Sequence, residues 1–111
     1  MANPDSDIRI LSEEEIDEKI KDFPGWIYKS KENKISKEFK FKKFNDCVNF
    51  IIKLAPFCNS IDHHPDIHIY YTKIVFDLQR FSVGGKVTER DFKVAAEIEK
   101  LYEDESLLSN I

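Results

Sequence analysis

The chain has 111 residues, 41% of them hydrophobic and 13% aromatic, and its formal net charge at pH 7 is −4. This length fits one domain, residues 1–111, with flexible ends expected at residues 1–10 and 104–111. The mixed, slightly acidic charge gives no basic surface for nucleic acid, and no apolar run approaches the length of a membrane span. The polar start of the chain has the wrong composition for a signal peptide, so we expect a cytoplasmic protein.

The first element is predicted to be a helix that begins after Ser12 and ends near Asp22. Ser12 and Glu15 have the spacing of a capping box, in which each side chain bonds the backbone N–H of the other residue. Pro24-Gly25 then breaks the helix.

Two strands are expected next, at residues 26–28 and 35–41. The second of these alternates between apolar and polar residues, which indicates a half-buried antiparallel strand, with Lys37 as the exception on the apolar side. That side otherwise carries Ile35, Phe39 and Phe41.

Residues 44–61 form the longest predicted helix, with Pro56 inside it. Cys47 and Cys58 would lie about 16 Å apart along it, too far for a disulfide, so both are expected as free thiols. Its apolar residues form two adjacent stripes that together cover roughly 220° of the helix, and we expect a second subunit to cover part of this surface. The first stripe is Phe44, Cys47, Val48, Ile51, Ala55 and Cys58, and the second is Phe50, Leu54, Phe57 and Ile61.

The next two predicted strands, residues 67–71 and 74–81, are joined by a tight connection near Thr72-Lys73. One face of the second strand is apolar, and the other face is available to a ligand. The first face is Ile74, Phe76 and Leu78, and the second is Val75, Asp77, Gln79 and Phe81.

Thr88 and Asp91 cap the last predicted helix, which is expected to fray from Glu103 onward. The order helix, strand, strand, helix, strand, strand, helix indicates an α+β fold. We expect a four-stranded antiparallel sheet with the helices packed on one face.

Two adjacent histidines, His63 and His64, follow the long helix and precede Pro65. The residue before a proline is held extended, so the pair is expected on a short rigid turn. Imidazoles exchange protons near neutral pH, which suits acid–base catalysis. The alternative is a histidine that only caps the carbonyls at the end of the helix.

These motifs occur together in one known family. The residues concerned are Leu11-Ser12-Glu13-Glu14, Trp26, Phe39-Lys40-Phe41-Lys42-Lys43-Phe44-Asn45, Phe50, Asp62-His63-His64-Pro65, Tyr71, Gly84-Gly85 and Thr88-Glu89-Arg90-Asp91. In this combination the sequence resembles the pterin-4a-carbinolamine dehydratase family, which is also known as the dimerisation cofactor of a homeodomain transcription factor.

The resemblance implies dehydration of 4a-hydroxytetrahydropterin to quinonoid dihydropterin, without a metal or an organic cofactor. It assigns acid–base catalysis to His63 and His64, and it implies a homodimer or homotetramer, which we expect to form through residues 44–61 and the sheet edges. The substrate-binding residues that it implies are Asp62, His63, His64, Gln79, Arg80, Phe81 and Ser82.

Two departures from the family pattern favour a different function. Phe81 stands where the family usually has a third histidine, and Asn59 stands where a charged residue is common. Phe81 can stack on a flat ring and Asn59 can hydrogen-bond, but neither exchanges a proton near neutral pH. The alternative function is therefore a non-catalytic binding, assembly or coactivator protein on the same scaffold.

The roles of two further residues stay open at the level of sequence. His68 either supplies an imidazole from a new position or faces solvent on its strand, and Arg80 either lines or blocks the pocket. A metal site of His63, His64 and His68 is a third alternative, which the extended chain expected after Pro65 argues against.

Overall fold

The computed structural model describes residues 9–80 and 84–109, with side chains of the last helix described as far as Asp104. Every predicted helix and strand is present, although several boundaries differ. The elements in chain order are α1 (Glu13–Lys19), the 3₁₀ helix η2 (Ile20–Asp22), β1 (Ile27–Lys29), β2 (Lys34–Lys40), α2 (Phe44–Ser60), β3 (Asp66–Tyr70), β4 (Lys73–Leu78) and α3 (Glu89–Ser109).

Two boundaries differ most from the predictions. Strand β4 ends at Leu78 instead of residue 81, and helix α3 continues to Ser109 instead of fraying from Glu103. The additional helical residues include leucine and glutamate, which are good helix formers.

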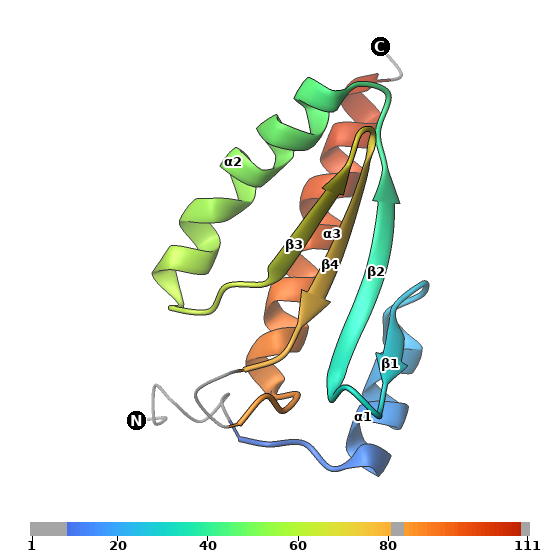
Figure 1. Cartoon of the computed structure of the whole chain (residues 1–111), viewed down its shortest axis with the longest axis vertical. Coiled ribbons are helices and arrows are strands. Elements are labelled where there is room, and N and C mark those ends of the chain that lie inside the picture. Colours follow the sequence, from blue (N-terminus) through green and yellow to red (C-terminus); the bar gives the residue numbers. More distant parts are fainter. Residues whose placement is uncertain (1–8, 81–83, 110–111) are drawn as a thin grey trace.

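The four strands form one antiparallel sheet in the order β1-β2-β4-β3 (Figure 1). Strands β2 and β4 are central, and the register places Ser36 and Asp66 on either side of Asp77. The predicted α+β fold with an antiparallel sheet is therefore confirmed.

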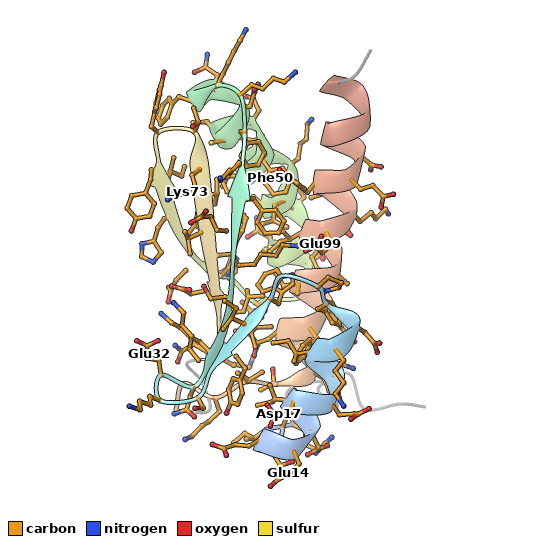
Figure 2. All side chains as sticks on the ribbon, turned by 90° about the vertical axis from the view of Figure 1, so that its right-hand side faces the viewer. Glu14, Asp17, Glu32, Phe50, Lys73 and Glu99 are labelled. Atoms are coloured by element: carbon orange, nitrogen blue, oxygen red, sulfur yellow. The ribbon has the colours of Figure 1, made fainter. Side chains whose placement is uncertain are left out.

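The helices cover one face of this sheet, and the core lies between the two layers. Figure 2 shows the layers from the side, with Phe50 between the helices and the strands. The core contains aromatic rings from both layers, including Phe39, Phe50, Phe76 and Tyr102. Ile74, Phe76 and Leu78 are fully buried, as expected for the apolar face of β4.

Lys37, the exception in the alternation of β2, has polar partners on the helix side of the sheet. Its ammonium group donates to the carbonyl of Pro24 over 2.9 Å and forms an ion pair with Glu99 of α3. Trp26 also donates its indole N–H to Glu99, over 2.9 Å. A lysine on the apolar side is therefore accommodated because α3 supplies a carboxylate for it.

The division of α2 into two stripes was wrong, because the core-facing side takes residues from both. Its buried residues are Cys47, Phe50, Leu54 and Cys58, which recur at helical spacing along one line. The outward apolar surface, which we call the α2 outer stripe, consists of Phe44, Val48 and Ile52, which are 49%, 37% and 63% exposed.

The described residues also test the predictions about disulfides and membrane spans. Cys47 and Cys58 are both free and buried, as expected. Within the described part of the chain, no helix is both long and apolar enough to cross a membrane.

Candidate active site at the end of helix α2

His63 is positioned by the way in which helix α2 ends. Asp62 adopts a left-handed conformation with φ of 51°, and its N–H donates to the carbonyl of Asn59 over 3.3 Å. The next N–H, of His63, donates to the carbonyl of Cys58 over 3.0 Å. This pair of bonds is a Schellman motif, and it fixes the backbone of His63 against the last turn of the helix.

Two guanidinium groups bind carbonyls at this helix end. Arg90 of α3 donates to the carbonyl of Ile61 over 2.9 Å, and Arg80 donates to the carbonyl of Asp62 over 3.3 Å. The C-terminal end of a helix carries partial negative charge, so both cations lie where the helix dipole favours them.

The His63 ring is buried and paired with a carboxylate of α3. Its Nε2 forms a short hydrogen bond with Oδ1 of Asp91, and the two side chains are 4% and 0% exposed. The other carboxylate oxygen of Asp91 accepts the backbone N–H of Thr88 over 2.8 Å and its hydroxyl over 3.2 Å. Asp91 therefore caps helix α3 and orients the imidazole at the same time.

The second nitrogen of the His63 ring faces a cation. Nη1 of Arg80 lies 3.4 Å from Nδ1 of His63. The backbone of Arg80 is held by hydrogen bonds with the backbone of Lys86. Both nitrogens of His63 therefore have polar partners within the protein.

His64 has the opposite environment, because its side chain is exposed. Its Nε2 forms a 2.8 Å hydrogen bond with Oδ1 of Asn59. The residue that replaces the common charged group is therefore in contact with the second imidazole. An amide oxygen that accepts from Nε2–H leaves Nδ1 of a neutral His64 as the acceptor nitrogen.

The remaining predicted site residues are only partly brought together. Arg80 lies against His63 and the backbone of Asp62. Gln79, by contrast, directs its side-chain oxygen towards Gly85, where any Cβ would collide with it. Phe81 and Ser82 lie outside the described residues.

His68 does not join this group. Its Nε2 lies 3.4 Å from Oδ2 of Asp77 on the open face of the sheet, and its side chain is 49% exposed. The described residues contain no cluster of three histidine, cysteine, aspartate or glutamate side chains arranged to hold a metal ion.

Sequence reasoning missed the roles of Asp91 and Arg90 in this site. Asp91 was interpreted only as a helix cap, yet a capping carboxylate has a second oxygen free to bind another group. The site is therefore a carboxylate–imidazole pair beside a second, exposed imidazole, an arrangement suited to proton transfer.

Residues 9–101 match the family described as pterin 4 alpha carbinolamine dehydratase. The chain belongs to this family. Two curated relatives named "Putative pterin-4-alpha-carbinolamine dehydratase" agree with the assignment. The relative from Sulfolobus acidocaldarius is 43% identical over 91 residues, which cover 82% of this chain and 97% of the relative. The relative from Saccharolobus solfataricus is 41% identical over 78 residues, covering 70% and 79% respectively.

Solved structures show the same pterin dehydratase fold. A transcriptional coactivator/pterin dehydratase from Brucella melitensis matches with a TM-score of 0.79 and 30% identity, over 85% of this chain and 99% of that one. A pterin dehydratase-like RuBisCO assembly factor of the alpha-carboxysome matches with a TM-score of 0.59, over 72% of this chain and 92% of that one. The second match, at 22% identity, shows a shared fold alone.

Proposed function

We propose that this member of the pterin dehydratase family removes water from 4a-hydroxytetrahydropterin and releases quinonoid dihydropterin. The observation that carries the proposal is the buried contact of His63 with Asp91, beside the exposed His64. Family membership supports the substrate class.

The reaction needs one base and one acid. A base removes the proton on ring nitrogen N5 of the pterin, the C4a–O bond breaks, a C4a=N5 double bond forms, and the departing hydroxyl leaves as water after it receives a proton. His63 suits the base, because Asp91 stabilises the imidazolium that forms. His64 suits the acid, because it reaches solvent and can be reprotonated there.

Turnover of freshly generated 4a-hydroxytetrahydropterin tests the proposal, with His63→Ala as the blank. Acceleration by the wild-type protein that is lost in the variant would support it. A wild-type rate equal to the uncatalysed rate would contradict it.

A second candidate function is non-catalytic binding or assembly on the same scaffold. The observation that favours it is the α2 outer stripe, where Phe44 and Ile52 are about half exposed or more. Replacement of the family's usual titratable groups at Asn59 and Phe81 points in the same direction. Absence of turnover together with an intact fold would favour this candidate.

The same stripe supports the predicted homodimer or homotetramer. Ile69, Tyr70 and Tyr71 add exposed apolar area near the edge strand β3, and patches of this kind mark association surfaces. We expect light scattering to give at least a dimer mass, and Val48→Glu to lower it. Asn49→Glu, which adds the same charge at an exposed neighbouring position of α2, is the matched control.

The cytoplasmic location stays a prediction.

A further inference from the structure

Arg80 has a position that neither the family assignment nor the proposed reaction explains. Its Nη1 lies 3.4 Å from Nδ1 of His63 and 3.3 Å from the carbonyl oxygen of Asp62. Because Nε2 of His63 is occupied by Asp91 in the interior, Nδ1 is the nitrogen left for a ligand. Arg80 therefore lies at the ring nitrogen that a ligand would have to reach.

The chemistry of the contact fixes where the proton lies on the ring. A guanidinium group has only donors and stays charged at all relevant pH values, so its contact with Nδ1 requires a lone pair on that nitrogen. The ring proton of His63 must then be on Nε2, where it is donated to Asp91. A second proton on Nδ1 would meet both an N–H donor and a positive charge.

We infer that Arg80 is a positioning residue that keeps Nδ1 of His63 unprotonated and ready to accept a proton. Asp91 and Arg80 act on the ring in opposite directions. The carboxylate stabilises the imidazolium that forms after proton transfer, whereas the guanidinium opposes that state before the substrate arrives. The inference rests on the proposed function in so far as it assigns the base.

Arg80 is also placed to respond to a ligand. Its Nε is buried and has no hydrogen-bond partner among the described residues. A movement of the guanidinium that gave this N–H an acceptor would therefore be favourable.

The charged and titratable groups near the imidazole come from three parts of the fold. Asp91 of α3 and Arg80 after β4 contact the ring. Arg90 of α3 binds the carbonyl of Ile61 at the end of α2, and Asp62 and His64 flank His63 in the chain. Of these, Arg80 is the cation within hydrogen-bond range of the ring.

Nuclear magnetic resonance of ¹⁵N-labelled histidine in the free protein tests the inference without any substrate. The tautomer and the pH at which His63 takes up its second proton are recorded for the wild-type protein, Arg80→Gln and Arg80→Lys. Lys86→Gln is the matched control, because it removes one positive charge from the residue that pairs with Arg80 through the backbone. Amide spectra verify the fold of each variant.

We expect Nδ1 of the wild-type ring to be unprotonated at neutral pH and Nε2 to carry the proton. Arg80→Gln should raise the proton affinity of Nδ1 about tenfold or more, since a like charge next to the ring is removed. Arg80→Lys and Lys86→Gln should stay near the wild-type value.

A protonated Nδ1 in the wild-type protein at neutral pH would overturn the inference, and this result depends on no variant. An unchanged proton affinity in Arg80→Gln would overturn it as well. Turnover is measured on the same samples. If the protein shows no turnover but Arg80→Gln has the expected effect, the proposed function is contradicted, whereas the inference that Arg80 keeps Nδ1 of His63 unprotonated is retained.

Discussion

The described residues contain two histidine–aspartate pairs that differ in the exposure of the histidine. The side chains of His63 and Asp91 are 4% and 0% exposed, whereas those of His68 and Asp77 are 49% and 8% exposed. His63 lies where the end of α2, the chain after β4 and the first turn of α3 meet. His68 lies on an edge strand, and its neighbour across the sheet is Val75.

The difference shows that a histidine next to an aspartate is not enough to make a candidate site. The surrounding helices and strands must also bury the pair and bring further polar groups to it. In the second pair only the histidine is exposed, and solvent around His68 screens its attraction to Asp77. In a buried pair, removal of one partner leaves the charge of the other buried and without a counter-charge, which strongly destabilises the protein. The cation beside the buried pair, Arg80, contacts the imidazole of His63, whereas the cation beside the other pair, Lys34, contacts the carboxylate of Asp77.

The largest expected effect separates the two histidines by activity. His63→Ala should lower dehydratase turnover about 10²–10⁴-fold, the usual contribution of a positioned acid–base group. His68→Ala should change the rate by less than about twofold, because His68 lies away from Asp91 and Arg80. Stopped-flow absorbance of the dehydration measures both. Comparable losses in the two variants would remove the distinction between the pairs.

The second largest expected effect distinguishes Asp91 from Asp77, through the stability and the activity of their asparagine variants. Asp91→Asn should lower the free energy of unfolding by roughly 1.5–3 kcal/mol, because hydrogen bonds to a buried charge are lost at Thr88 and His63. Turnover should fall with it. Asp77→Asn should also destabilise the protein, through Lys34 and Ser36, but should leave turnover unchanged. Urea denaturation and turnover of both variants provide the comparison.

A smaller effect appears in the pH dependence of stability. Burial alone would raise the pKa of Asp77, but hydrogen bonds from Ser36 and Lys34, with the charges of Lys34 and Lys29, lower it overall. The group therefore contributes stability that is present above its unfolded pKa of about 3.9 and is lost as pH falls through the lower folded pKa.

Urea denaturation between pH 5 and pH 2.5 should consequently show a shallower loss of stability in Asp77→Asn than in the wild-type protein. Asp104→Asn, an exposed position on α3, is the control and should follow the wild-type curve. Identical slopes for all three proteins would exclude a contribution from Asp77.

The smallest effect concerns the thiol beneath the His63 turn. Burial raises the pKa of Cys58 to about 11, so its reactive thiolate is scarce at neutral pH. Cys58 should be alkylated by iodoacetamide only at the rate of global unfolding, as read from peptide masses over time. Rapid alkylation of Cys58 in the native protein would show that the turn opens locally.

Much of the fold followed from local patterns. The capping box at Ser12 and Glu15 is formed as predicted, since it depends on residues three apart. The alternation of apolar and polar residues in β2 and β4 predicted which side chains face the core, because side chains of a strand alternate between the two faces of a sheet. The orientation of α2 was less predictable, since its broad apolar surface allowed more than one side to face the core.

The sequence by itself determined the secondary structure, the α+β class and the family, and it singled out His63 and His64. These depend on short-range periodicity and on motifs that are contiguous in the chain. Only the tertiary structure decided that Asp91, 28 residues away, orients His63, that Arg80 faces its other nitrogen, and that His68 belongs elsewhere. Such contacts depend on where helix α2 ends relative to α3 and β4. That geometry is set by packing of the whole core, which no local pattern encodes.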